Sequence, residues 1–230
     1  MIYSIAGITV ELDFKYKYGE EKCERYLSEG SPVFSAFATD DEIQKEKLNT
    51  PENSLEACEF DCVFRKLYNY APKEGRMLVH GAALMMHGKA FLFTAPSGTG
   101  KSTHIKLWGK KFGKDVTVID GDKPFVSFEN GKAFVWGSPR SGKEGWNNPI
   151  SAPLCGIAFL VRSEKNRIEK VSPLEMAEKF FAQCYIPKSK DTALLSVEMI
   201  NGILSTVPLY KLYCNMEIEA AEIAFNGMNN

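Results

Sequence analysis

Apolar and polar positions follow one another along this chain with two different periods, which predict a succession of strands and helices. Apolar runs bounded by glycine or charged residues indicate buried strands, and they cover residues 77–86, 90–94, 115–119, 156–161 and 209–213. Two further segments are typical of hairpins. Residues 2–12 turn at Gly7, and residues 125–136 turn at Asn130-Gly131, a dipeptide that favours tight turns.

Helices are predicted where apolar residues recur three or four positions apart. They cover residues 54–70, 101–112, 172–184, 192–205 and 217–225. Ser172 fits the start of the third helix, because Pro173 takes the first helical position and Glu175 follows at the position that completes a capping box. The first quarter of the chain has a weaker pattern, and we expect an irregular β-rich section there.

These elements predict a single compact α/β domain in which helices flank a mixed sheet that contains hairpins as well as parallel strands. We expect residues 1–70 to form an N-terminal β-rich section plus a helix packed on the core. Residues 71–230 would form the core itself, and the two parts would make one continuous domain. No internal repeat, low-complexity tract or obvious linker divides the chain.

Composition and charge narrow the class of protein. Hydrophobic residues make up 44% of the chain and charged residues 25%, enough to bury a core beneath a polar surface. The formal net charge of −1 gives no overall attraction to nucleic acid or to an anionic membrane, and no apolar run is long enough to span a bilayer. The start of the chain lacks a secretory signal, and the six cysteines form no Cys-x-x-Cys pair, so we expect reduced thiols in a cytoplasmic protein.

The strongest chemical signal is a strand, a glycine-containing loop and a helix in direct succession. Residues 95–102, Ala-Pro-Ser-Gly-Thr-Gly-Lys-Ser, fit the phosphate-binding loop pattern with Ala in place of the first Gly. Such a loop points backbone N–H groups and a helix N-terminus at an anion. We expect Lys101 to reach the terminal phosphates of ATP or GTP and the Ser102 hydroxyl to hold Mg²⁺. The predicted nucleotide-binding residues are Ser97, Gly98, Thr99, Gly100, Lys101, Ser102 and Thr103.

Candidate catalytic carboxylates follow the strand after the helix of this loop. Asp120 and Asp122 lie where an acidic residue meets Mg²⁺ and the γ-phosphate in loop-containing enzymes. Either carboxylate could hold the metal or accept a proton from an attacking hydroxyl, and the sequence leaves open which does which. Asp122 precedes Lys123-Pro and the next strand, so it is the first choice for both roles. A solvated Asp-Gly-Asp turn is the alternative.

Three further side chains are candidates for the site. His80 precedes Gly81 and would lie beside the strand of the loop, where it could donate a hydrogen bond to phosphate or contact a metal, or remain a core histidine. Arg140 and Lys143 belong to a loop rich in Gly and Ser between two tryptophans. They could stabilise a transferring phosphoryl group, bind an acidic substrate, or simply face water.

In their order along the chain, these motifs resemble the catalytic core of HPr kinase/phosphorylase and related small kinases of the phosphoenolpyruvate carboxykinase-like fold. The resemblance rests on Val79-His-Gly81, residues 95–103 and Asp120-Gly-Asp122. It implies that Lys101 contacts the β- and γ-phosphates, that Ser102 binds the metal, that Asp122 lies near the attacking hydroxyl and that His80 is the site histidine. Residues 1–70 resemble no family.

The sequence also departs from that family. Gly121 stands where the family has the first Asp of a pair, and the later Pro-Gly-Arg-Asn-type signature is missing. The chain therefore looks more like the relatives that act on a peptide serine or a small hydroxyl compound than like a true HPr kinase/phosphorylase.

Taken together, the motifs predict an ATP- or GTP-dependent, Mg²⁺-dependent kinase that transfers the γ-phosphoryl group to a hydroxyl of a peptide or a small metabolite. The expected partners are the nucleotide and the acceptor, with neither nucleic acid nor a membrane; many relatives of the resembled family assemble into homo-oligomers. Two alternatives stay open: a nucleotide-binding regulatory or scaffold protein without transfer, and an ATPase coupled to a partner.

Overall fold

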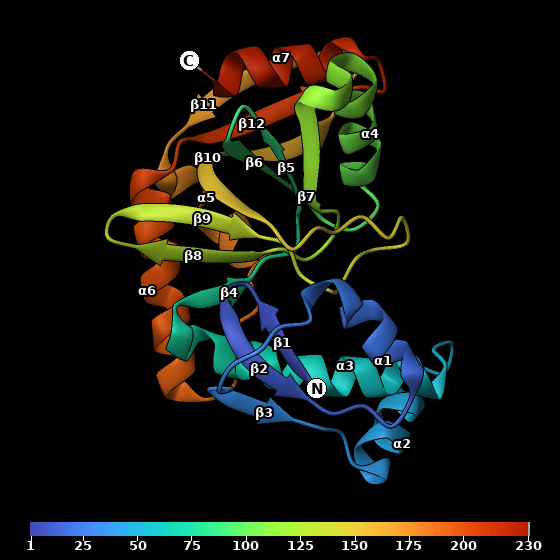
Figure 1. Cartoon of the computed structure of the whole chain (residues 1–230). Coiled ribbons are helices and arrows are strands. Elements are labelled where there is room, and N and C mark those ends of the chain that lie inside the picture. Colours follow the sequence, from blue (N-terminus) through green and yellow to red (C-terminus); the bar gives the residue numbers. More distant parts are fainter. Residues whose placement is uncertain (230) are drawn as a thin grey trace.

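A mixed sheet of nine strands runs through the larger part of the molecule, as the computed structural model, which describes residues 1–229, shows (Figure 1). In order of pairing, the main path of the sheet consists of β4 (Arg76–Leu78), β8 (Phe125–Glu129), β9 (Lys132–Trp136), β10 (Ser151–Arg162), β6 (Lys89–Thr94), β5 (Ala82–Met86) and β7 (Val116–Asp120). In addition, β12 (Leu209–Cys214) pairs with β10 and with β11 (Arg167–Val171).

The long strand β10 organises this sheet because it pairs with three others. Residues 151–153 pair antiparallel with β9, whereas the rest of the strand pairs parallel with β6 and with β12. The carboxyl ends of β6, β10 and β12 therefore point the same way. In open α/β sheets, ligands bind in the crevice outside such ends.

Helices cover both faces of the sheet. On one face lie α4 (Lys101–Phe112) and α7 (Glu219–Met228), and on the other α5 (Pro173–Phe181) and α6 (Lys190–Thr206). The alternation of side chains along β6 supplies both cores, because Phe91 and Phe93 join the α4 and α7 cluster while Leu92 joins the α5 and α6 cluster. Between residues 1 and 229, no helix combines the length and apolar character needed to cross a membrane.

The N-terminal residues add a smaller sheet and three helices at the opposite end of the molecule from α7 (Figure 1). The hairpin of β1 (Ile2–Ile5) and β2 (Ile8–Leu12) pairs with β3 (Phe34–Ala36), and the helices are α1 (Lys17–Cys23), α2 (Asp40–Asn49) and α3 (Leu55–Tyr70). Phe64 and Leu67 of α3 share a buried cluster with Tyr3 of the small sheet and Phe125 of the large one. Helix α3 thus packs against both sheets. Short 3₁₀ turns follow α1, α3 and α4 at Glu24–Tyr26, Ala71–Glu74 and Gly113–Asp115.

The predicted mixed α/β arrangement with flanking helices is confirmed, as are both hairpins and the helices at 54–70 and 101–112. The prediction of an irregular β-rich first quarter is wrong between residues 13 and 50, where α1 and α2 lie. Helix α2 begins with a capping box in which Thr39 Oγ1 accepts from the Glu42 N–H and Glu42 Oε2 accepts from the Thr39 N–H. Its three acidic residues in the first turn suit the positive end of the helix dipole. The apolar stripe of α2 is too weak to predict a helix, but the capping box at its N-terminus marks where the helix begins.

Candidate functional site

The loop between β6 and α4 has the backbone of an anion site. Gly98 and Gly100 have φ angles of 78° and 122°, and an added Cβ would meet nothing within 4 Å at either position. Glycine is therefore favoured there by the backbone conformation and not by a lack of space for a side chain. No side chain among residues 1–229 caps the N-terminus of α4. The first N–H groups of the helix therefore remain available to a ligand.

Lys101 lies folded onto this loop. Its Nζ donates a hydrogen bond to the Ala95 carbonyl at 2.8 Å, and the residue is 8% exposed. Burial lowers the pKa of Lys101, and the charge of the nearby Asp122 carboxylate opposes that shift. The charge of Asp122, the carboxylate after β7, therefore acts on the loop lysine, although the two side chains form no ion pair within the described residues.

His80 joins Asp122 from the break between β4 and β5. Its Nε2 lies 3.8 Å from Asp122 Oδ1, and its Nδ1 lies 3.0 Å from Gln183 Oε1, a partner that the sequence did not indicate. Burial, together with the charge of Lys101, lowers the pKa of His80, which favours the neutral ring. The backbone N–H of Gly81 donates to the Asp122 carbonyl at 2.9 Å, so the two segments are fixed to each other.

Asp120 has a different environment from Asp122. It is fully buried, and its carboxylate accepts from the backbone N–H groups of Asp122, Lys123 and Ser138 at 2.9, 2.8 and 3.0 Å and from Ser138 Oγ at 3.0 Å. Burial raises the pKa of Asp120 to about 7, while these hydrogen bonds oppose the rise. Its oxygens are thus engaged in holding the turn that carries Asp122. The Asp122 side chain is 30% exposed, and of the two carboxylates it is the one open to a ligand.

The segment from 137 to 150 folds back over this turn. The Gly121 N–H donates to the Trp146 carbonyl at 2.8 Å, and the Asn148 N–H donates to the Ile119 carbonyl at 2.9 Å. A Cβ on Gly142 would lie 3.1 Å from the Asp122 Cβ, which explains why a residue without a side chain stands there. The segment therefore closes directly onto Asp122.

The two cations predicted in this segment point to different neighbours. Arg140 forms an ion pair with Asp61 of α3, so it reaches across to the N-terminal section. Lys143 lines a cavity of about 470 Å³ that also contains Asp122, Arg140 and Asp61. Within residues 1–229, neither cation forms a hydrogen bond or an ion pair with residues 95–102.

Glu144 is the residue of this segment that reaches the loop helix. Its Oε2 accepts from Ser102 Oγ at 3.4 Å, and a Cβ on Gly142 would lie between it and Asp122. No group of three His, Cys, Asp or Glu side chains within residues 1–229 could hold a metal by itself. The hydroxyl and carboxylates present fit Mg²⁺, which is usually held by one or two carboxylates together with phosphate oxygens and water.

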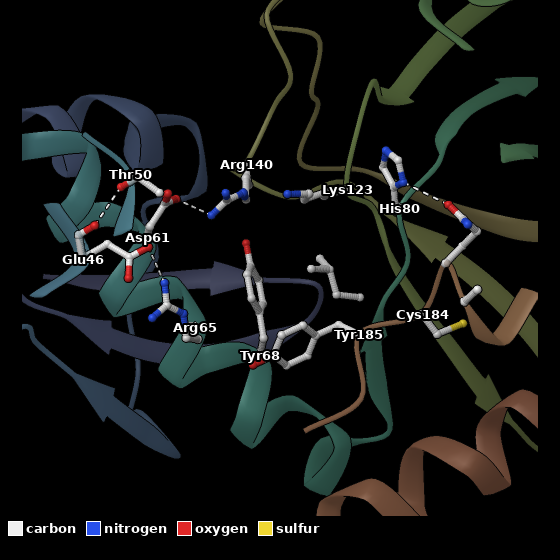
Figure 2. A pocket seen from close by; sticks show the side chains of 13 residues that line it. Glu46, Thr50, Asp61, Arg65, Tyr68, His80, Lys123, Arg140, Cys184 and Tyr185 are labelled. Carbon is white, nitrogen blue, oxygen red and sulfur yellow. Dashed lines mark hydrogen bonds and ion pairs between the residues drawn. The ribbon is translucent and has the colours of Figure 1, made fainter. Parts of the chain in front are cut away.

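Two further cavities lie near these residues, in addition to the 470 Å³ cavity that contains Asp122. One, of about 710 Å³, lies at the carboxyl ends of β10 and β12 beside the loop and is lined by Thr99, Thr103, Arg162, Cys214 and Met216 among others. The other, of about 450 Å³, lies between α3 and the segment that carries His80 (Figure 2). Both volumes fall in the range of small-molecule sites.

No family model matches the chain, and no curated protein matches it. Among solved structures, the chain is similar to the Hpr(Ser) kinase/phosphatase from Coxiella burnetii, with a TM-score of 0.36 and 11% sequence identity. The match covers 65% of this chain and 89% of that chain. A likeness at this level carries no argument about function.

Proposed function

We propose that this protein is a nucleotide- and Mg²⁺-dependent phosphotransferase that moves the γ-phosphoryl group onto a hydroxyl. The observation that carries the proposal is the position of Asp122. Its partly exposed carboxylate lies 3.8 Å from His80, its charge acts on the loop lysine, and it lines a cavity that contains no residue of the loop. A hydroxyl in that cavity would find a base on one side and a phosphoryl group on the other.

The nucleotide would lie along the carboxyl ends of the parallel strands. Its phosphates would accept hydrogen bonds from the backbone N–H groups of residues 98–103, and the ribose and base would occupy the 710 Å³ cavity. Arg162, whose guanidinium donates to the carbonyls of Gly98 and Thr99, would hold the loop in shape. Ser102, with Glu144 or Asp122, would hold Mg²⁺, which neutralises phosphate charge when it is bound.

The transfer itself requires little covalent chemistry from the protein. The acceptor oxygen forms a bond to the γ-phosphorus as the bond to the β–γ bridging oxygen breaks, and the nucleoside diphosphate leaves. Asp122 would accept the hydroxyl proton, and the Lys101 ammonium would stabilise the negative charge on the phosphates. Asp120 would act as a positioning residue for Asp122.

The proposed kinase core is residues 71–230, of the type found in HPr kinase-related enzymes, because the order of the motifs resembles that core. Residues 1–70 would form the wall that faces the acceptor, since Asp61 and Tyr68 of α3 line the cavity next to His80. A nucleotide-binding protein without transfer is the second candidate. A partly exposed carboxylate whose charge acts on the loop lysine favours the enzyme.

A phosphate-transfer screen tests the proposal. Labelled γ-phosphate of ATP is followed into pooled hydroxyl metabolites and serine peptides, with the wild-type protein, Asp122→Asn and the matched control Asp115→Asn, an exposed aspartate just before β7. We expect Asp122→Asn to lower transfer about a hundredfold or more while leaving the affinity for MgATP within about threefold. Equal transfer by both variants would refute the role of Asp122. Tight MgATP binding with no transfer to any acceptor would establish the second candidate.

A further inference from the structure

The 450 Å³ cavity next to His80 has more positive charge than its carboxylates balance (Figure 2). Three cations and two carboxylates line it: Arg65, Lys123 and Arg140, and Glu46 and Asp61. Both carboxylates are already paired, Glu46 with Arg65 at 2.6 Å and Asp61 with Arg140. The Lys123 ammonium forms neither a hydrogen bond nor an ion pair within residues 1–229, so its charge is left without a counter-charge in contact.

A second group in the cavity also lacks a partner. The Tyr68 hydroxyl is buried, the residue is 5% exposed, and the hydroxyl lies close to the Arg140 guanidinium without a well-formed hydrogen bond to it or to any other group in the described part of the chain. Figure 2 shows this hydroxyl and the Lys123 ammonium both pointing toward the Arg140 guanidinium. Buried polar groups are normally satisfied, and one that is not calls for a ligand or a water.

Electrostatics support the same interpretation. Burial lowers the pKa of Lys123, and the like charge of Arg140 lowers it further. Burial raises the pKa of Tyr68, so the hydroxyl stays protonated and can donate. The unpaired Lys123 ammonium and the Tyr68 hydroxyl, both directed toward the Arg140 guanidinium, therefore offer donors and positive charge to an anion.

We propose that Lys123, Arg140 and Tyr68 bind an anionic group of the phosphoryl acceptor, which is a small hydroxyl compound that carries a carboxylate or a phosphate. This inference rests on the proposed function. His80 lines this cavity and lies 3.8 Å from Asp122, and Asp61 and Arg140 line both this cavity and the 470 Å³ cavity that contains Asp122. A molecule held here by its anionic end would therefore direct a hydroxyl into the neighbouring cavity, toward the Asp122 carboxylate. The volume suits a compound of metabolite size and would not admit a folded protein.

Binding measurements without phosphoryl transfer test this site separately. Glycerate, which has a carboxylate and two hydroxyls, is titrated calorimetrically into the full chain without nucleotide, and glycerol serves as its neutral analogue. Glycerol 3-phosphate is titrated into a Lys101→Ala background, in which the loop has lost its ammonium group and binds phosphate less tightly. A serine peptide with acidic neighbours is the fourth probe. These arms separate carboxylate, phosphate and peptide as sources of the anionic group.

The variants have close controls in the same chain. Tyr68→Phe removes only the hydroxyl, and Tyr3→Phe removes another buried hydroxyl without a partner that lines none of these cavities. Lys123→Met removes the ammonium, and Lys132→Met removes an exposed one on β9. Thermal melts check that every variant folds.

We expect glycerate or glycerol 3-phosphate to bind and glycerol not to bind. Lys123→Met should weaken the anion about tenfold or more and Tyr68→Phe about threefold or more, with both controls unchanged. Binding that is equal in wild type and in both cavity variants would overturn the proposal, as would binding of the peptide alone. If the anion binds with this pattern but the protein transfers no phosphate, the anion site is supported and the proposed phosphotransferase activity is refuted. If the protein transfers phosphate to neutral acceptors, the activity is supported and the anion site is refuted.

Discussion

Removal of the Asp120 carboxylate is expected to destabilise the turn that carries Asp122. In the wild-type protein this buried carboxylate accepts hydrogen bonds from three backbone N–H groups and from the Ser138 hydroxyl; the two from Ser138 are buried, and those from Asp122 and Lys123 are partly buried. In Asp120→Ala the three N–H groups lose their acceptor. Each buried donor left unsatisfied costs about 1–3 kcal/mol, and relaxation and entering water recover part of the sum. We therefore expect Asp120→Ala to lower the free energy of unfolding by about 3–6 kcal/mol.

Asp120→Asn should cost less, because the amide keeps one oxygen. That oxygen can still accept from the N–H groups of Asp122 and Lys123, while the amide nitrogen donates to Ser138 Oγ. The Ser138 hydroxyl can then donate to the Lys123 carbonyl, which already lies 2.9 Å away. One backbone N–H, that of Ser138, loses its acceptor, so the expected cost is about 1–3 kcal/mol.

The pH dependence gives the same residue an independent test. Burial raises the pKa of Asp120 from 3.8 to about 7, so the folded protein binds a proton that the unfolded chain has already released between these values. The stabilisation from this proton is fully present below about pH 4 and is lost as the pH rises through about 7. Asparagine does not titrate, so in the Asp120→Asn variant the free energy of unfolding should lose the part of its pH dependence that Asp120 contributes.

Equilibrium urea unfolding, followed by tryptophan fluorescence at about pH 5.5 and about pH 8, measures both effects. Asp115→Ala is the control, because that aspartate is exposed and none of the hydrogen bonds above involves it. A cost below about 1 kcal/mol for Asp120→Ala would refute the assignment of Asp120 to the turn. A slope with pH that Asp120→Asn leaves unchanged would show that another group carries it.

Four further variants test the neighbouring geometry. Gly81→Ala would place a Cβ 2.8 Å from a methyl of Leu92, so it should lower the free energy of unfolding by about 1–3 kcal/mol. Gly109→Ala, in open space on α4, should instead raise it by about 0.5–1 kcal/mol in the same unfolding assay. Lys101→Ala should lower phosphate transfer by about two to three orders of magnitude with an unchanged circular dichroism spectrum, and retained transfer would exclude the loop as the phosphate site. Because burial lowers the pKa of His80 from 6.5, any acid limb that it causes in the pH–rate profile should lie below pH 6.5 and disappear in His80→Asn.

The parts of the fold that depend on neighbouring residues could be predicted from the sequence. The loop at 95–102 lies between a strand and a helix that each have a clear apolar pattern, and Asn130-Gly131 sets its hairpin turn with two positive φ angles. Helix α2 is also indicated locally in the sequence, by the capping-box pair of Thr39 and, three residues later, Glu42. It was missed because its apolar positions are few, although the cap was readable.

The parts of the candidate site that depend on distant residues could not be predicted. Asp120 and Asp122 look alike in the sequence, and what separates them is a backbone N–H and a hydroxyl of Ser138, eighteen residues further along. Gln183 meets His80 across 103 positions. Arg140 turns toward Asp61 on a helix that no motif linked to the loop. Such pairs follow from the tertiary arrangement alone.

Helix α3 connects the stability of the molecule with the proposed acceptor site. Phe60, Phe64 and Leu67 form its buried stripe, and Asp61, Arg65 and Tyr68 each follow one of these residues by one position. A step of one residue rotates the helix by about 100°, so the second set forms a neighbouring stripe that faces the cavity. The contacts that fix α3 against Phe125 of the large sheet therefore also fix the rotation at which Tyr68 and Asp61 meet Arg140. Substitutions at Asp61 and Arg65 would therefore change the polar lining of the proposed acceptor site with little effect on the core, whereas changes at Tyr68 would affect both, because Tyr68 also belongs to the buried cluster.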